Sequence, residues 1–543
     1  MKHAKTENNI YFEENELENN LSEDYVVEDK EKEHKNYHKV ISIIIVIIMM
    51  VYLFSKYRPI DKPFSFIIIY TFVSICVCIF LYLGINQILK GEYKLEKVFI
   101  TCAIPLGLIY TLLIPPGIVP DEWVHMQNTF SLSSQIMLKE ENNKITMKNS
   151  EIELYNQQTT VGNNDYYNYI YNNIFSLSKD NNYSNIDVES PGLGQLFGYF
   201  PAVLGTTVSR VLHLGAVTTV YVARLCNFIF YLALTYFALK KIPFGKVLLF
   251  AITMLPMASH QMFSLSYDTI INSASFFCIA YGMFFVYQSN EVELKDVIVY
   301  GLSGILLLAN KGSAYAFILV IPILAKYFNP NEEPYARKIK KITFLIIILG
   351  IILIKLKTYF DAEKVASLST ISGQKIVSWA GVPSYTLSEM LSNIPGTIQL
   401  FLDTFVQKGS YYINTAIGSL MGWLLIPIPT WIINSWIGIL IASAFVEKSD
   451  RDVFTYRHKL LYFLIALGVI LVVMLAMALD WTPSGYTVIE GVQGRYYIPI
   501  IFLLLIPLQN SKLYLNQKLI SFLLVIIPIM SAITVINLIP LVL

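Results

Sequence analysis

The residues best placed to do chemistry form a short acidic and histidine-containing stretch at the end of an apolar run. Prolines interrupt that run within 115–120, and Asp121, Glu122 and His125 follow them. Pro120 suits the first turn of a helix, and a helix that begins there places His125 one turn from both carboxylates. Such a group can bind a divalent cation or hold a carboxylate ready as a general base. The alternative is an ordinary acidic helix start, because the helix macrodipole favours acidic residues in a first turn.

Composition assigns the class of protein that must position this stretch. Of the 543 residues, 55% are hydrophobic and 15% are charged, and the mean hydropathy is +0.53. These values indicate an all-α, polytopic helical membrane protein rather than a soluble globular chain. The net charge of +1 gives no signal for a nucleic-acid partner. The five cysteines lie within apolar runs without metal-ligand spacing, so neither a disulfide framework nor a cysteine metal site is expected.

Apolar runs long enough to cross about 30 Å of hydrocarbon recur along most of the chain. The first 38 or so residues are polar and acidic, which is typical of a disordered cytoplasmic tail. Residues 39–543 are expected to form one multi-span membrane domain of about 13 spans. The predicted spans lie near 40–55, 65–89, 98–118, 217–239, 246–264, 269–288, 296–310, 313–328, 341–356, 428–446, 459–479, 496–509 and 517–541.

The distribution of basic residues orients these spans. Lysines and arginines concentrate in the loops near 90–97, 240–246, 337–341 and 448–459, which we therefore expect to be cytoplasmic. The three longest polar segments then lie outside together. They are a long first outer loop at 120–215, a second at 357–412 and a third at 480–495.

Two segments leave the number of spans open. The segment 190–214 is apolar enough for a span, but a span there would reverse the orientation of everything that follows. We therefore expect an interfacial or re-entrant helix in that segment. Asn310-Lys311-Gly312 interrupts the run 296–328 and predicts two short spans that meet outside, and a single kinked helix is the alternative.

Charged residues within spans or at their ends are the next candidates for a site, because they are costly in hydrocarbon. Arg224 lies about two turns inside a span. Asp268 and Arg495 begin spans at their outer ends, and Lys311 lies between two spans. All four are expected on the same face as Asp121. A group of cations near the headgroup level can hold a lipid phosphate, and arginine does so with a bidentate fork. For Arg224 and Arg495 the alternative is snorkelling to the interface.

Several short motifs occur in a characteristic order. They are Pro120-Asp-Glu-x-x-His125, the Ser190-Pro segment that leads to Tyr199-Phe-Pro201, Ser266-Tyr-Asp268, Ala309-Asn-Lys311 and Gln493-Gly-Arg-Tyr496. In this order they resemble an uncharacterised bacterial family of polytopic membrane proteins, domain of unknown function 2142. That family in turn is similar to the GT-C class of glycosyltransferases, which includes the oligosaccharyltransferase catalytic subunits and the protein O-mannosyltransferases.

The resemblance implies an activity. GT-C enzymes take sugar from a polyprenyl-phosphate or polyprenyl-diphosphate donor, and their first outer loop opens with acidic catalytic or metal-binding residues. Asp121 and Glu122 match that acidic motif, and Asp268 matches the second outer acid. Lys311 and Arg495 occupy positions suited to phosphate contacts. No Asp-x-Asp occurs at 121–125, which departs from the class and leaves metal dependence open.

These observations lead to a hypothesis about function. The chain is expected to be a GT-C-like glycosyltransferase at the outer face of a bacterial cytoplasmic membrane, in cell-surface polysaccharide or glycoconjugate assembly. Its partners would be membrane lipid, a polyprenyl-linked sugar donor and a glycan or lipid acceptor. Candidate catalytic residues are Asp121, Glu122, His125 and Asp268, and candidate substrate-binding residues are Arg224, Lys311, Arg495, Gln493 and Tyr496. Asp121, Glu122 and His125 are also the candidate ligands of Mg²⁺ or Mn²⁺.

Two other classes of function stay open. One is a transporter, flippase or polymerase-type protein for lipid-linked saccharides, and the other is a non-catalytic assembly protein of the membrane. Transporters often contain internal repeats and polar groups near the midplane, whereas the charges here lie toward one face. Soluble nucleotide chemistry has no support, because the sequence has no P-loop, dinucleotide-binding turn or nucleophile elbow.

Overall fold

Long apolar helices dominate the architecture. The computed structural model describes residues 37–542 except 59–63, 92, 141–142, 158–161, 179–181, 289–290, 310–313, 323–332, 336–337, 340–341, 343–344, 347–348, 351–374, 447–453, 510–511 and 513. Within these described residues, seven helices are long and apolar enough to cross a membrane. They are the helix Tyr37–Lys56, α2 (Phe64–Leu89), α3 (Leu95–Leu113), α8 (Ala216–Lys241), α11 (Asp268–Tyr287), α18 (Tyr456–Asp480) and α20 (Gln517–Val542).

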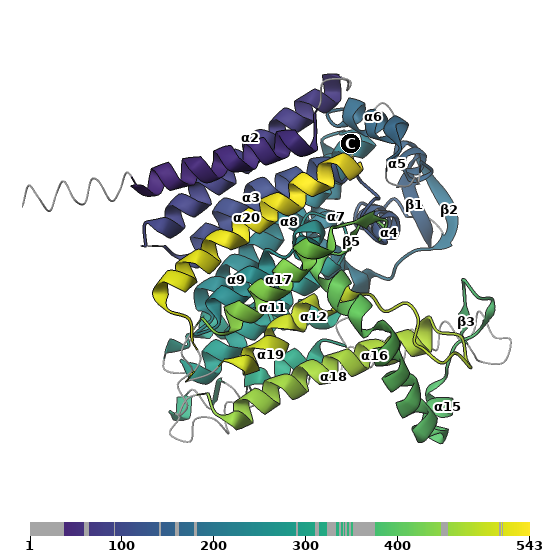
Figure 1. Cartoon of the computed structure of the whole chain (residues 1–543). Helices are drawn as coiled ribbons and strands as arrows, with labels where there is room; N and C mark the ends of the chain where they lie inside the picture. Colours follow the sequence, from purple (N-terminus) through teal and green to yellow (C-terminus); the bar gives the residue numbers. More distant parts are fainter. Residues whose placement is uncertain are drawn as a thin grey trace, which may run out of the picture.

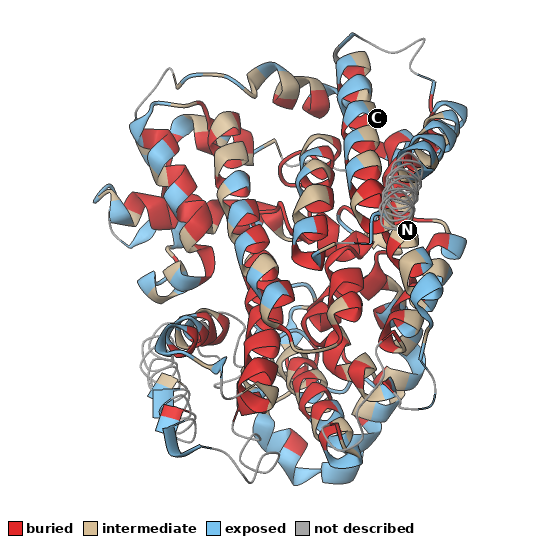
Figure 2. Cartoon of the chain, turned by 90° about the vertical axis from the view of Figure 1, so that its left-hand side faces the viewer, coloured by how far each residue is buried: buried red, intermediate tan, exposed pale blue. Residues whose placement is uncertain are grey.

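The exposed side chains of these helices are those of a membrane protein. Figure 2 shows buried residues on the inner faces of the bundle and exposed residues on its outer faces. Many exposed side chains on the long helices are large and apolar, such as Ile48, Ile75 and Phe522. A surface of this kind is a liability in water and is suited to contact with hydrocarbon. The prediction of a helical membrane protein is therefore confirmed.

Seven of the predicted spans coincide with the seven long helices. Three others correspond to shorter helical segments: α12 (Leu294–Ala309), α17 (Thr430–Ala444), and the run of η5 (Gly494–Ile500), α19 (Ile501–Leu505) and η6 (Ile506–Leu508). The span predicted at 246–264 is broken into α9 (Lys246–Thr253) and α10 (Pro256–Gln261), because proline lacks an N–H and suits the start of a new helix.

Several predictions fall partly or wholly outside the described residues. The predicted tail at 1–38 lies almost wholly outside them, as does Lys311. Of the predicted span at 313–328, the structure describes the short helix η4 (Ala316–Val320) and its flanks. The span at 341–356 is described at scattered positions only.

The first long polar segment, 120–215, is folded rather than extended. It contains α4 (Glu122–Ile136), β1 (Lys144–Lys148), α5 (Asn149–Tyr155), α6 (Asn164–Asn173), β2 (Tyr183–Glu189), η1 (Leu193–Gln195) and α7 (Leu196–Val211). Strands β1 and β2 pair antiparallel, and a small apolar core that includes Trp123, Met126 and Phe130 lies beneath them. Glu151 and Arg210 form a buried ion pair in the same unit.

Helix α7 occupies the segment predicted to be interfacial or re-entrant. It has 16 residues and is about 24 Å long, which is less than the hydrocarbon thickness. It packs along α8, from which a tight turn at 212–215 separates it.

The fold departs from a purely helical one in three places. Besides β1 and β2, the described residues contain two other two-stranded antiparallel sheets: β3 (Ile376–Val377) with β4 (Val382–Pro383), and β5 (Leu420–Met421) with β6 (Ile426–Pro427). Between them lie α15 (Leu387–Ser392) and α16 (Ile394–Ile417). Helix α16 begins where the Asn393 side chain accepts a hydrogen bond from the backbone N–H of Gly396 at 3.0 Å.

The three long polar segments lie at the same end of the molecule. Figure 1 shows α4–α6, β1 and β2 on the right-hand side of the bundle, which is also the side of β3 and α15. The second and third segments are joined by Lys375 and Asp480, whose side chains are 2.8 Å apart. The first and third are joined by the ion pair of Asp121 with Arg495. The described parts of the three segments therefore lie together, and the side of the membrane that they face stays a prediction.

Basic residues gather at the opposite end of α8 and α11. Lys241 at the end of α8 pairs with Asp296 at 3.2 Å. The hydroxyl of Tyr287, at the end of α11, lies 3.3 Å from Nδ1 of His458. This is the end that the positive-inside rule predicts to be cytoplasmic.

Candidate functional site

The site begins in the turn between α3 and α4. Gly117 has a φ of +84°, and a Cβ there would lie 2.1 Å from the ring of Trp123, so only glycine fits. Asp121 has a φ of +62°, a left-handed conformation that Asp adopts more readily than most residues. Helix α4 begins at Glu122, two residues later than predicted. Asp121 therefore precedes the helix instead of sharing its first turn.

Glu122 is fully buried, and both of its carboxylate oxygens are engaged. Arg224 donates from Nε to Oε1 at 2.8 Å, and the backbone N–H groups of Gly117 and Leu265 donate at 2.8 and 3.0 Å. Arg224 also donates to two backbone carbonyls of the α3–α4 turn, at 2.8 and 3.0 Å. This pair ties the turn to α8 and to the residues before α11. The geometry favours a positioning role for the pair over the catalytic and substrate-binding roles predicted for it.

Arg495 lies between two carboxylates from different parts of the chain. Its Nη2 pairs with Oδ2 of Asp121, and its Nε lies 3.1 Å from Oδ2 of Asp268. Its guanidinium carbon is 5.2 Å from the centre of the Tyr496 ring, a cation–π distance. The side chains of Arg495 and Asp268 are 2% and 11% exposed, whereas that of Asp121 is 39% exposed. A substrate can therefore reach Asp121 more readily than the other two.

A close contact between η5 and α16 holds Arg495 in this position. The N–H of Gly494 donates to Oγ1 of Thr415 at 3.2 Å. A Cβ at Gly494 would lie 2.1 Å from the carbonyl oxygen of Tyr412 and 2.4 Å from the backbone nitrogen of Ala416. The glycine of the Gln493-Gly-Arg-Tyr motif thus has a packing reason: no larger residue allows this approach.

His125 is held beside Asp268 by a chain of hydrogen bonds. Nδ1 of His125 lies 2.7 Å from the hydroxyl of Tyr199, a phenol whose pKa is raised by burial. Nε2 of His125 lies 3.2 Å from Oγ of Ser266, also at hydrogen-bond distance. The same Oγ accepts from the backbone N–H of Asp268 at 3.1 Å. The imidazole also meets the Tyr267 ring edge to face at 4.6 Å. His125 is thereby fixed in one orientation.

The structure thus brings together five of the nine predicted site residues: Asp121, His125, Asp268, Arg495 and Tyr496. Glu122 and Arg224 lie in the adjacent buried pair. Gln493 lines a separate cavity of about 320 Å³ with Lys408 and Glu490, whose charged groups are 2.6 Å apart. Lys311 lies outside the described residues.

The donor set does not fit a divalent cation. Glu122 is turned toward Arg224, and the two remaining carboxylates contact the guanidinium of Arg495. Among the described residues no three or more His, Cys, Asp or Glu side chains are grouped so that they could hold a metal ion. A tight site for Mg²⁺ or Mn²⁺ at Asp121, Glu122 and His125 would need a different arrangement of these side chains.

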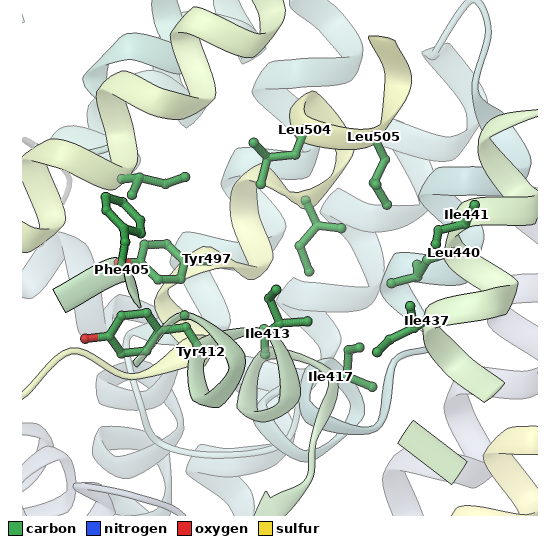
Figure 3. Close-up of a pocket in the computed structure, with 14 residues that line it drawn as sticks. Phe405, Tyr412, Ile413, Ile417, Ile437, Leu440, Ile441, Tyr497, Leu504 and Leu505 are labelled. Carbon is green, nitrogen blue, oxygen red and sulfur yellow. The ribbon is translucent and has the colours of Figure 1, made fainter. Parts of the chain in front are cut away.

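The segment that carries Arg495 also lines an apolar pocket of about 370 Å³, through Tyr497 and the residues after it (Figure 3). It is formed by α16, α17, α18 and the η5–α19 segment. The rings of Tyr412 and Tyr497, 5.8 Å apart, lie at one end of the pocket, and Tyr497 follows Arg495 by two residues. Ile441 and Leu505 lie at the other end. The pocket therefore extends from Tyr412 and Tyr497 along the apolar helices.

For some residues of the site, the sequence predicted no role. Tyr199 and Ser266 stand within the quoted motifs, which was the available signal, but their contacts with His125 depend on the fold. Tyr315 donates from its hydroxyl to the carbonyl of Tyr496 at 2.8 Å, and the indole of Trp423 donates to the carbonyl of Gly117 at 2.8 Å. Nothing in the local sequence marks these last two contacts, because they join residues 181 and 306 positions apart.

Comparison with known proteins identifies one family. A family model described as "Predicted membrane protein (DUF2142)" matches residues 104–504. The matched region contains the α3–α4 turn, the start of α11 and the Arg495 segment. No curated protein and no solved structure matches the chain.

Proposed function

The chain belongs to the DUF2142 family of predicted membrane proteins, and we propose that it is a GT-C-type membrane glycosyltransferase with a polyprenyl-phosphate-linked sugar donor. It would act at the outer face of a bacterial cytoplasmic membrane, in cell-surface polysaccharide or glycoconjugate assembly. The observation that carries the proposal is the position of Arg495, which is buried between Asp121 and Asp268 and precedes by two residues Tyr497, which lines an apolar pocket.

Arg495 is suited to a phosphate group. Its Nη1 is buried and finds no hydrogen-bond acceptor among the described residues. An unsatisfied buried N–H is costly, and a phosphate oxygen is the kind of acceptor that a guanidinium binds best. The apolar pocket beside Tyr497 offers room for the hydrocarbon chain of the same molecule. A lipid-linked phosphate needs both features side by side.

Donor binding would also prepare the base. While Arg495 pairs with Asp121, the carboxylate is held by a positive charge and is a poor proton acceptor. A donor phosphate that takes over the guanidinium releases Asp121 toward the acceptor. Asp268 keeps its contact with Nε and holds the arginine in place. Asp121 would thus act as a base mainly when the donor is present.

Transfer replaces one bond at the anomeric carbon of the sugar with another. The acceptor hydroxyl oxygen forms a bond to the anomeric carbon of the sugar, and its proton passes to the carboxylate of Asp121. The bond from that carbon to the phosphate oxygen breaks, and the leaving polyprenyl phosphate keeps the electron pair. Arg495 stabilises the charge that develops on this oxygen. A positioned general base contributes about 10²–10⁴ in rate. No step uses a metal ion.

The test is transfer by purified, reconstituted protein. Polyprenyl-phosphate-linked sugars with a labelled sugar are offered with candidate glycan and lipid acceptors, and new glycosidic bonds are detected by mass spectrometry. Wild-type protein should form product and Asp121→Asn should not. Asp187→Asn is the matched control, because Asp187 is an exposed carboxylate of the same outer segment that pairs with Lys144 away from the cluster.

The second candidate is a transporter or flippase for lipid-linked saccharides. It is favoured by the break between α9 and α10, because interrupted helices with polar groups at the break are typical of transporters. The residues Ser259, His260 and Gln261 of α10 are all buried. Vesicles that contain the protein and move lipid-linked sugar across the bilayer, with no new glycosidic bond, would assign this function instead.

A further inference from the structure

A groove of about 930 Å³ lies between α7, α8, α11 and α12, away from the Arg495 cluster. It exists because α7 is shorter than the helix it covers. Helix α7 has 16 residues and α8 has 26, which correspond to about 24 and 39 Å. The tight turn at 212–215 places the end of α7 beside the start of α8. The beginning of α7 therefore reaches only the middle of α8, where Phe200 contacts Phe230 at 5.0 Å between ring centres.

The uncovered half of α8 forms one wall of this groove. Its lining is mostly apolar and includes Phe197, Phe237, Phe277 and Leu302. Phe237 and Leu302 are 45% and 58% exposed, so the groove opens to the surroundings of the bundle. In a membrane these surroundings are hydrocarbon, and acyl chains can enter from the side.

The groove ends among charged residues. Lys240, Lys241, Lys295 and Asp296 line this end. Lys241 forms an ion pair with Asp296 at 3.2 Å, and Lys295 forms one with Glu293 at 2.6 Å. Lys240 is exposed and makes no ion pair with any residue that the structure describes. Three ammonium groups against two carboxylates leave this end of the groove with a net positive charge.

An amphipathic anion fits this combination. The lysines stand at the last residues of the span α8, which is the headgroup level of the leaflet at the basic end of the molecule. We propose that the groove binds an anionic phospholipid of that leaflet, with its phosphate on Lys240 and its acyl chains along Phe237, Phe277 and Leu302. Zwitterionic phospholipid has the same chains but lacks the net charge that the unpaired lysine favours.

The location separates this lipid from the proposed sugar donor. Asp268 begins α11 at the Arg495 cluster, whereas Lys241 and Phe284 meet near the other end of that helix, 4.0 Å from ammonium to ring centre. The headgroup end of the groove thus lies about 24 Å along α11 from the Arg495 cluster. The phospholipid site does not depend on the proposed glycosyl transfer.

The experiment measures bound lipid on the full chain. Protein is reconstituted with equal amounts of phosphatidylglycerol and phosphatidylcholine, extracted in mild detergent and examined by native mass spectrometry. Wild type should retain phosphatidylglycerol preferentially, and Lys240→Gln should lower this preference about fivefold, from about 1 kcal/mol per basic residue near a membrane surface. Lys97→Gln is the matched control, since Lys97 is an exposed lysine of the basic end on α3, which does not line the groove.

A second variant tests the apolar part without a change of charge. Ala233 lines the groove from α8 and is exposed, so Ala233→Trp fills the groove while the helix keeps its contacts. It should lower retention of both phospholipids. The proposal is overturned if wild type shows no preference for phosphatidylglycerol, or if Lys240→Gln behaves like Lys97→Gln. It is equally overturned if polyprenyl phosphate displaces phosphatidylglycerol with the same dependence on Lys240 and Ala233, because the groove would then belong to the donor.

Discussion

Asp121 and Glu122 are neighbours in the chain but have opposite environments. The Asp121 side chain is 39% exposed and shares Arg495 with Asp268, whereas Glu122 is fully buried and clamped by Arg224. A left-handed backbone at Asp121 turns the two side chains apart. At the scale of single residues, the acidic pair therefore divides into one accessible carboxylate and one that holds the turn.

Substitutions that replace each carboxylate by a neutral amide should separate these two roles. Asp121→Asn should abolish transfer but lower the free energy of unfolding by only about 1–2 kcal/mol, because Asp268 remains as a counter-charge for the buried Arg495. Glu122→Gln leaves the buried Arg224 without a counter-charge and should destabilise the protein by about 3–5 kcal/mol. Thermal unfolding in detergent measures the difference. Equal stability of the two variants would show that the Glu122–Arg224 pair does not hold the turn.

Arg495 offers a test of donor binding. Arg495→Lys keeps the charge, but an ammonium has no planar fork to contact a phosphate and Asp268 together. Donor use should fall by one to two powers of ten, about 1.4–2.7 kcal/mol in transition-state stabilisation. A rise in donor KM alone would indicate contact in ground and transition states, and a fall in kcat would indicate contact with the leaving group only. Unchanged kinetics would place the phosphate elsewhere.

At the scale of elements, one glycine decides how η5 meets α16. Gly494 is the residue that lets the segment carrying Arg495 approach the backbone of α16. The break between α9 and α10 also helps to position the site. The chain that follows it passes Glu122, where the backbone N–H of Leu265 donates to the carboxylate, before α11 begins. Both features bring segments that are distant in the sequence to the site.

Substitution of Gly494 should therefore disturb the site. Gly494→Ala places a methyl group 2.1 Å from the carbonyl oxygen of Tyr412, so η5 must shift, at about 1–3 kcal/mol. Transfer should be lost with it. Gly438→Ala is the control, because a Cβ at Gly438 on α17 meets nothing within 4 Å and Gly438 does not line the apolar pocket. If both variants keep wild-type transfer and melting temperature, the η5–α16 contact is not required.

Much of the element list was predictable from the sequence, because hydrocarbon thickness and hydrophobic length are directly linked. The long spans, and Asp121, Asp268 and Arg495 as residues of one site, followed from length, hydropathy and charge position. The contact between Glu122 and Arg224 could not be predicted, because the two residues lie 102 positions apart in the sequence. The sheet of β1 and β2 was also missed, because its strands are short and lie among polar residues.

At the scale of the whole molecule, polar segments occupy one end and basic residues the other. Lys375 with Asp480 and Asp121 with Arg495 join three polar segments that are far apart in sequence. Lys241 with Asp296 marks the opposite end. The candidate site thereby lies at the end of the bundle where the polar segments meet.

Cysteine accessibility tests this polarity. On a background without the five native cysteines, Asp165→Cys and Ser484→Cys should react with a membrane-impermeant maleimide added to intact cells. Lys97→Cys should react only after the membrane is opened, because positive-inside orientation places it in the cytoplasm. All three positions are exposed, so a lack of labelling reports the compartment rather than burial. Labelling of Asp165→Cys and Ser484→Cys from opposite sides would refute the shared face.

The buried pair of Glu122 and Arg224 also sets an order on synthesis. A chain made from its N-terminus at about 5–20 residues per second exposes Glu122 roughly 5–20 s before Arg224 is made. Until then the carboxylate stays hydrated and the turn after α3 stays open. The folded segment 120–215 can close only when α8 has entered the membrane. A nascent chain halted before α8 would thus present an unclosed turn to surface proteases, and its survival time would report on the progress of insertion.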